Sequence, residues 1–362
     1  MRNTLIIVLL TSSWLPLLHG QETESPDSGS QQRSDVELFP ILSYDTDVGF
    51  GYGVKGFFLD HLTLSESFDL VLFHSTKGER WYRLVASFPD IELRQRTLYP
   101  LALDFLIDYD KLINANFFGV GNSSSYDARE IYTKTPLEIS ITTSRGFTPT
   151  VVGQFLIRYR TVSISRMNPL GNLAVQMQTS THRATSISLV LSLRYDTRNS
   201  FVNPTTGTVV LGEGGWAPQW SSSTISFSRL AFFTQGYIPL NGIVFAGRLA
   251  VQKINGTNLP LQTLLPIGGV NSLRGYPQDR FLDKASTIIN LEARFMLLWR
   301  LAGVAGWDIG KVWSSLGKAD LRSWPNNPTV GLRLLMDNFV VRLDVGFSRE
   351  TTGLYLNFGQ LF

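Results

Sequence analysis

Three features of the 362-residue sequence predict an all-β fold, a transmembrane antiparallel β-barrel. The first is alternation with a period of two, as where the apolar Ile187 and Leu189 alternate with Ser186 and Ser188. Secondly, after residue 20 no apolar run approaches the about 18 residues that a helical membrane span needs. The third is the supply of 31 glycines and 12% aromatic residues, which suits turns and the bilayer interface. One face of each strand is therefore expected in lipid and the other in a polar lumen.

The same alternation predicts sixteen strands in residues 36–362, with fourteen as the alternative count. Long connections at 112–129, 163–184, 255–284 and 315–327 alternate with short turns, which is the asymmetry expected between the outer and inner ends of such a barrel. A secreted β-sandwich or a soluble propeller is the rival architecture. The expected strands are 36–44, 48–60, 67–77, 80–92, 98–111, 130–143, 147–162, 185–197, 207–217, 223–238, 242–254, 285–300, 301–314, 328–336, 338–347 and 352–362.

The N-terminus predicts export. Residues 1–20 have a basic start at Arg2, an apolar run and the small residue Gly20, as in a signal peptide, with an uncleaved anchor as the alternative. Residues 21–35 are polar and rich in Ser and Gln, which predicts a disordered periplasmic lead-in. The expected domains are thus a signal peptide (1–20), the lead-in (21–35) and an outer-membrane barrel (36–362).

Composition excludes several function classes. The chain has no Cys, so disulfides and thiolate metal sites are impossible, and its formal charge of +3 does not suggest a nucleic-acid partner. Beyond the signal peptide the histidines are His61, His74 and His182, without a GxSxG or HExxH motif or a metal-spaced acidic cluster. His74 with Ser75 is the nearest approach to a hydrolase pair. We expect neither an enzyme nor a cofactor or metal ion.

The stretch IGGVNSLRGYPQDRF, residues 267–281, is the main candidate functional motif. Its glycines permit backbone conformations that other residues resist, and they surround the step Arg274-Gly275-Tyr276. A guanidinium held in a polar lumen would match carboxylates. Alternation points Glu292 and Asp308 into the lumen, with glycines at 306 and 310 leaving room beside Asp308. An ordinary ion pair in a wet lumen is the alternative.

Together with FFGVGN (117–122), DTRNSFVNPTTG (196–207) and the final GLYLNFGQLF, this motif resembles the barrel domain of the BamA/TamA bacterial surface-antigen superfamily over residues 36–362. The resemblance implies a sixth external loop folded into the barrel, with Arg274 as a lock received by Glu292 and Asp308. It also implies help in inserting or translocating other proteins at the outer membrane. The roughly 15 residues before the barrel are too few for the globular POTRA modules of many relatives. A periplasmic POTRA-containing or chaperone partner and client barrel proteins are therefore expected, besides outer-membrane lipid.

Two other segments receive structural roles. Asp196, Pro204 and Gly207 are expected to set a periplasmic turn. The final strand resembles the C-terminal signal that assembly machinery reads on barrel clients. The residues of this signal are Leu354, Leu356, Phe358 and Phe362.

The seam between the first and last strands is expected to be weak. Pro40 cannot donate a ladder hydrogen bond, and Gly353 and Gly359 soften the partner strand. Leu42 and Leu356 are the expected neighbours across it. Glycine and proline also occur at barrel rims for geometric reasons, and a passive channel or structural barrel without insertion activity is the alternative function.

Overall fold

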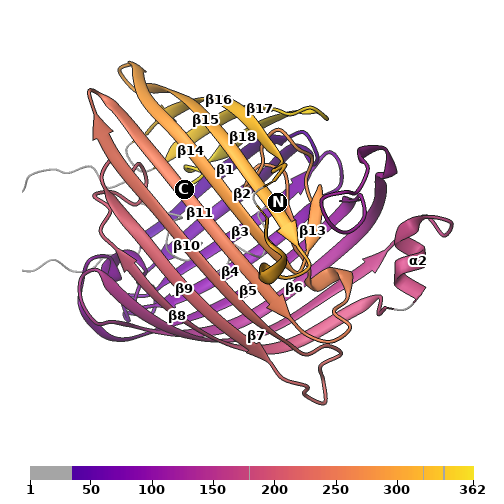
Figure 1. Ribbon diagram of the computed structural model, residues 1–362. Helices are drawn as coiled ribbons and strands as arrows, with labels where there is room; N and C mark the ends of the chain where they lie inside the picture. Colours follow the sequence, from indigo (N-terminus) through magenta and orange to yellow (C-terminus); the bar gives the residue numbers. More distant parts are fainter. Residues whose placement is uncertain (1–34, 179, 321, 337–338) are drawn as a thin grey trace, which may run out of the picture.

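The computed structural model describes residues 35–362 except 179, 321 and 337–338, and its main feature is a closed barrel of sixteen antiparallel strands (Figure 1). Neighbours in sequence are neighbours around the wall, and β1 meets β18 to close it. The predicted fold class and strand number are confirmed, and the sandwich, propeller and fourteen-strand alternatives are wrong. The signal peptide and all of the lead-in except its last residue lie outside the described residues.

The strands of the wall are β1 (Asp35–Asp45), β2 (Gly49–Leu59), β3 (Ser67–Ser75), β4 (Arg80–Phe88), β5 (Tyr99–Phe117), β6 (Glu130–Gly146), β7 (Val151–Ser165), β8 (Arg183–Asp196), β9 (Gly207–Ala217), β10 (Phe227–Leu240), β11 (Ile243–Asn255), β14 (Ala285–Leu298), β15 (Leu301–Trp313), β16 (Asn326–Leu335), β17 (Val340–Phe347) and β18 (Thr352–Phe358). The remaining elements are the two-stranded sheet β12 (Leu265–Ile267) and β13 (Phe281–Asp283), helix α2 (Asn172–Gln178), and 3-10 turns at Glu92–Arg94, Tyr126–Ala128, Leu261–Thr263 and Leu316–Lys318.

Five strand boundaries differ from expectation by four residues or more, namely the ends of β4, β5 and β18 and the starts of β7 and β10. Strand β5 continues to Phe117, beyond the expected end at 111, because its pairing with β6 resumes after an irregularity and runs on to Glu130. The expected final strand 352–362 ends at Phe358. Gly359 has a φ of 82° and donates its N–H to the Val340 carbonyl, so the chain leaves the wall there.

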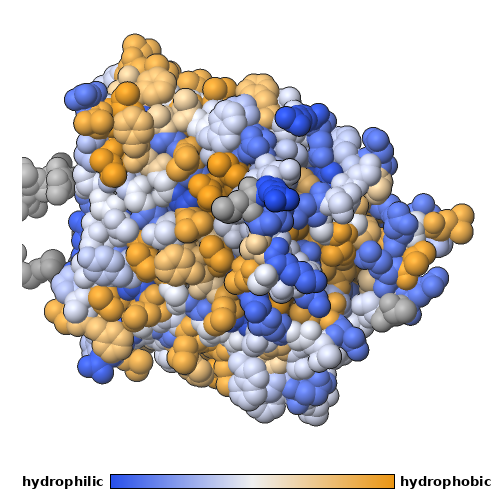
Figure 2. Space-filling model, in the orientation of Figure 1, coloured by the Kyte–Doolittle hydropathy of each residue, from blue (hydrophilic) through white to orange (hydrophobic). Residues whose placement is uncertain are grey.

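Alternation separates an apolar outer face from a charged inner face. Leu191 is 65% exposed and Leu230 is 60% exposed, while Asp104 and Asp108 on the inner face are buried. Apolar side chains spread over the outer face of the strands nearest the viewer (Figure 2). Since the inward carboxylates are buried and the outward leucines are largely exposed, the outer face is suited to lipid.

The long connections gather at one end of the barrel. Residues 118–129, 166–182, 256–284 and 314–325 connect strands at this end, where α2 projects (Figure 1). The opposite end has short turns, such as 147–150 and 241–242, and holds the C-terminus. No helix among the described residues is both long enough and apolar enough to cross a membrane.

Candidate functional site

The connection 256–284 between β11 and β14, called the inner loop below, folds into the lumen. Gly268 and Gly269 have φ values of 121° and 82°, a left-handed backbone that glycine accepts without strain. The Ser272 hydroxyl accepts the Gly268 N–H at 2.7 Å, and the Gly269 N–H donates to the Tyr276 carbonyl at 2.9 Å. These bonds close a compact tip whose turn presents Arg274.

Arg274 is fully buried and every part of its guanidinium is paired. Its Nε and Nη2 donate to the two oxygens of Asp308 at 2.9 and 2.8 Å. Its Nη1 donates to Glu292 Oε1 at 2.7 Å and to Asp344 Oδ2 at 3.2 Å. The two-pronged contact with Asp308 uses the planar fork that lysine lacks. Arg274, Glu292, Asp308 and Asp344 are called the Arg274 cluster below.

Further cations and amides surround these carboxylates. Arg333 Nη1 lies 2.6 Å from Asp344 Oδ1, and Arg294 Nη2 lies 2.8 Å from Glu292 Oε2. Asn290 Nδ2 donates to Asp308 Oδ1 at 2.8 Å and also to the Ser272 carbonyl in the loop. The three carboxylates are therefore matched by arginines and amides, which offsets the cost of burying them.

Glycines allow the loop backbone to approach the wall. A Cβ on Gly346 would lie 2.3 Å from the Arg274 carbonyl carbon, and one on Gly353 would lie 2.3 Å from the Arg274 oxygen. Gly353 was expected to soften the seam, but it faces the loop. On the loop side, a Cβ on Gly275 would meet Asn327 and the Phe347 backbone at 2.7 Å. Gly310 makes room for loop side chains as expected, with Ile267 Cδ1 3.2 Å from its added Cβ, whereas Gly306 faces only wall residues.

An apolar cluster anchors the loop beside the ion pairs. Burial raises the pKa of the Tyr276 hydroxyl, which donates to the Asn326 carbonyl at 3.4 Å, and its ring packs edge-on against Phe281 at 5.4 Å. The loop members pack on inward apolar side chains from β9, β10, β11, β14 and β15. The cluster comprises Ile267, Leu273, Tyr276, Phe281, Leu211, Ala231, Phe233, Ala250, Ile288 and Val312.

The seam is the least paired joint of the barrel. Strand β1 pairs with β2 along all eleven of its residues, from Asp35 to Asp45. With β18 the described residues pair only as Tyr44 with Leu356 and Asp45 with Tyr355. The expected pairing of Leu42 with Leu356 is therefore wrong by two residues. The described β1–β18 ladder thus comprises two residue pairs, both at the Asp45 end of β1.

The inner loop contacts both sides of the seam at its paired end. The Gln278 N–H donates to Asp47 Oδ2 at 2.8 Å, in the turn after β1. Arg280 Nη2 donates to Glu350 Oε1 at 2.7 Å, in the turn before β18. A single loop thus links the two turns that border the seam.

The C-terminal residues turn into the lumen at the other end. Gln360 Nε2 donates to Asn203 Oδ1 at 3.0 Å, and Arg294 Nη2 donates to the Phe362 carbonyl at 3.0 Å. Phe362 is 7% exposed and packs near Tyr237, so it does not alternate with Leu354, Leu356 and Phe358 along a strand. The described ladder between β1 and β18 therefore does not extend to this end of the barrel. The recognition role of these four residues stays a prediction.

The remaining predicted residues have structural contacts. The turn after β8 holds an ion pair from Asp196 to Arg198 at 2.7 Å. It ends at Gly207, whose φ is 102° and whose added Cβ would lie 2.4 Å from the Thr197 carbonyl. Pro204 lies within the same turn, residues 197–206. His74 pairs with the Tyr82 hydroxyl at 2.8 Å, not with Ser75. In the described chain no group of three or more His, Asp or Glu could hold a metal ion.

Sequence reasoning missed Asp344, Arg333 and Arg294 as members or neighbours of the Arg274 cluster. The available signal was alternation, because Leu343 and Val345 are apolar and lie on the face opposite to Asp344 in the sequence pattern of this strand. The alternation pattern does not predict how far the inner loop extends across the lumen.

This geometry defines a class: a transmembrane β-barrel with a loop held inside it by a buried arginine. The Omp85 superfamily domain matches residues 74–348, and the chain belongs to that superfamily, whose members are outer-membrane barrels for translocation or insertion. No curated protein matches the sequence.

Solved structures share the fold at low sequence identity. BamA from Haemophilus ducreyi lacking POTRA domains 1–3 is similar at a TM-score of 0.67 and 14% identity, covering 90% of this chain and 70% of that one. CdiB from Escherichia coli is similar at 0.61 and 12%, with coverage of 90% and 67%. CdiB from Acinetobacter baumannii is similar at 0.57 and 12%, with coverage of 90% and 65%. In this chain the described residues form the barrel and its loops, without a POTRA-like module.

Proposed function

We propose that the barrel assists the insertion or translocation of other proteins at the outer membrane by opening sideways at the β1–β18 seam. The observation that carries the proposal is the pairing of only two residues of β1 with β18. Backbone N–H and C=O groups that lack partners in hydrocarbon are costly. Residues 38–43 of β1, which lie outside the described β1–β18 ladder, would therefore favour an incoming client strand that satisfies such groups by strand addition.

In this proposal the inner loop controls the opening. Its Arg274 cluster fixes the tip against β14, β15 and β17, while its bonds to Asp47 and Glu350 hold the turns on either side of the seam. Release of the Asp47 and Glu350 bonds would leave β1 and β18 joined by two ladder pairs and by the hydrogen bonds between Thr46 and Leu354, which can then open. The Arg274 cluster would keep the loop on the β14–β17 side during this step. This is a binding and assembly activity without bond chemistry.

The partners follow from the same step. Client barrel proteins would supply the strand that adds to β1. A periplasmic POTRA-containing protein or chaperone would deliver them, because the described residues contain no module for that task. Outer-membrane lipid would contact the apolar outer face.

The test is a cysteine crosslink across the seam in this Cys-free chain. The pair Tyr44→Cys with Leu356→Cys joins register partners of β1 and β18. The control pair Leu42→Cys with Tyr52→Cys joins register partners of β1 and β2, away from the seam. Each full-length variant is placed in liposomes, and the folding rate of a urea-denatured outer-membrane protein is followed with and without reductant.

Acceleration by the wild type and by the oxidised control, lost in the oxidised seam pair and restored by reductant, is the expected result. Equal acceleration by the oxidised and reduced seam pair would refute sideways opening. Absence of acceleration by the wild type, with steady ion conductance, would favour the passive channel.

A further inference from the structure

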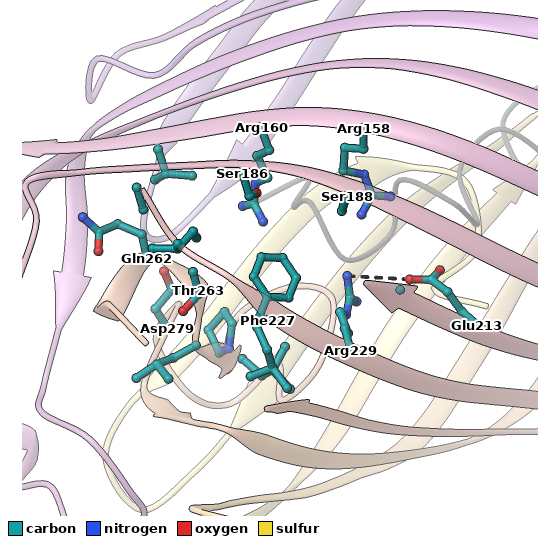
Figure 3. A pocket seen from close by; sticks show the side chains of 18 of the residues that line it. Arg158, Arg160, Ser186, Ser188, Glu213, Phe227, Arg229, Gln262, Thr263 and Asp279 are labelled. Carbon is teal, nitrogen blue, oxygen red and sulfur yellow. Dashed lines mark ion pairs between the residues drawn. The ribbon is translucent and has the colours of Figure 1, made fainter. Parts of the chain in front are cut away.

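A cavity of about 120 Å³ lies between the inner loop and the wall formed by β7 to β11. Arg158 and Arg160 of β7 enter it from one side and Arg229 of β10 from another, and their guanidinium groups face the space between (Figure 3). The loop closes the cavity through residues such as Asn271 and Ser272.

Cations outnumber carboxylates around this cavity. Arg158, Arg160, Arg229, Arg248 and Lys134 line it, against Glu213 and Asp279. Three of the cations have carboxylate partners: Arg158 with Glu138 at 2.8 Å, Lys134 with Asp279 at 3.4 Å, and Arg229 with Glu213 at 3.8 Å. Arg160 and Arg248 have no ion pair within the described chain.

Donor groups are also left without partners. The Nε atoms of Arg160 and Arg229 are buried and make no hydrogen bond within the described chain. Arg248 Nη1 donates one hydrogen bond to the Asn271 carbonyl at 3.2 Å. Since buried guanidinium groups are costly unless paired, the cavity favours an added anion.

We propose that this cavity binds a phosphate group. A tetrahedral oxyanion offers acceptors in several directions, which suits arginine forks arriving from β7, β10 and β11 and the Ser186 and Ser188 hydroxyls of β8. A carboxylate offers its acceptor lone pairs only in its own plane. Because Arg248 also bonds the loop backbone, the bound phosphate would hold the inner loop against the wall.

The phosphate has two possible sources, free phosphate or the headgroup of a phosphorylated lipid. The lining includes the apolar Phe227, Ile225 and Leu264, which would receive the start of a lipid chain. The experiment below separates the two.

The full-length barrel in a neutral, phosphate-free detergent is titrated calorimetrically with sodium phosphate at constant ionic strength. We expect saturable binding that weakens about tenfold or more in Arg160→Gln and in the double variant Arg160→Gln with Arg229→Gln, because charge-assisted bonds are lost. Glu213→Gln removes a competing carboxylate and should tighten binding. The control Arg80→Gln removes an exposed arginine at the end of β4, outside the cavity, and should leave binding unchanged.

Non-saturable heat, or equal affinity in the wild type and Arg160→Gln, would overturn the proposal. The single variant keeps the ion pair of Arg229, so the test survives if the double variant fails to fold. A second titration uses short-chain phosphatidic acid. Tighter binding than inorganic phosphate, reduced to the phosphate level by Phe227→Ala, would identify a lipid headgroup, whereas equal binding of the two probes would identify free phosphate.

Discussion

The Arg274 cluster and the β1–β18 seam are neighbours with opposite characters. Around Arg274 every carboxylate contacts at least one arginine, and the Arg274, Glu292, Asp308 and Asp344 side chains are all fully buried. At the seam two residue pairs join strands that could pair over a much longer stretch. The loop links the two regions through Asp47 and Glu350, in addition to the β17–β18 ladder in which Asp344 pairs with Tyr355.

This contrast indicates that contacts of the inner loop in the lumen hold the barrel closed. In an ordinary barrel the ladder between first and last strands supplies the closure. Here the ladder at this joint is short, and a buried loop holds the turns that flank it. The stability of the closed form should therefore depend more on luminal residues than on seam residues.

The largest stability effect is expected from Arg274→Ala. Removing the arginine leaves three buried carboxylates short of a partner, and breaking a buried pair in this way typically costs about 3–5 kcal/mol. We expect the urea midpoint of the detergent-solubilised barrel to fall by the corresponding amount, with partial loss of heat-modifiable gel migration.

Arg274→Lys is the matched control for charge. It keeps one cation but loses the fork that engages both oxygens of Asp308. An intermediate stability is expected. If the alanine variant matched the wild type, the loop would not be held by this arginine.

Gly346→Val should have the next largest effect, since its Cβ would occupy the position of the Arg274 backbone. Overpacking of this kind usually costs about 1–3 kcal/mol. The control is Gly236→Val in β10, where an added Cβ meets nothing within 4 Å. Urea unfolding should separate the two variants, and equal midpoints would mean that the loop backbone does not need this approach.

Alternation in the sequence predicted the strands of the barrel wall well, but it predicted the contacts inside the lumen only in part. Strand β9 begins at Gly207 and ends at Ala217, the range that alternation gave, because each wall strand has its own apolar face. Glu292 and Asp308 followed from the same face assignment, and both contact Arg274.

What was missed depends on contacts between distant residues. The pairing of β12 with β13 is only three residues long, too short for a periodic signal. Phe362 looked like the end of a strand, but its neighbours Tyr237 and Arg294 lie far back in the sequence. The reach of Arg274 to Asp344 likewise depends on how the barrel curves round the loop.

The smallest effect is expected at the loop-to-seam ion pair. The Glu350 side chain is 22% exposed although that of Arg280 is only 3% exposed, and glutamine keeps an oxygen that can accept from Arg280, so Glu350→Gln should cost about 1 kcal/mol globally. The substitution should increase local opening at the seam more than it lowers the global stability. The reason is that the bond from Glu350 to Arg280 holds the turn before β18, beside a seam of two residue pairs. We expect faster amide hydrogen exchange at Tyr44 and Asp45. The control Asp69→Asn removes the carboxylate of the Asp69–Lys55 ion pair, in which both side chains are partly exposed, within the β2–β3 ladder, and should not change exchange at the seam. If both variants changed it equally, general softening of the barrel rather than closure by the loop would explain the exchange.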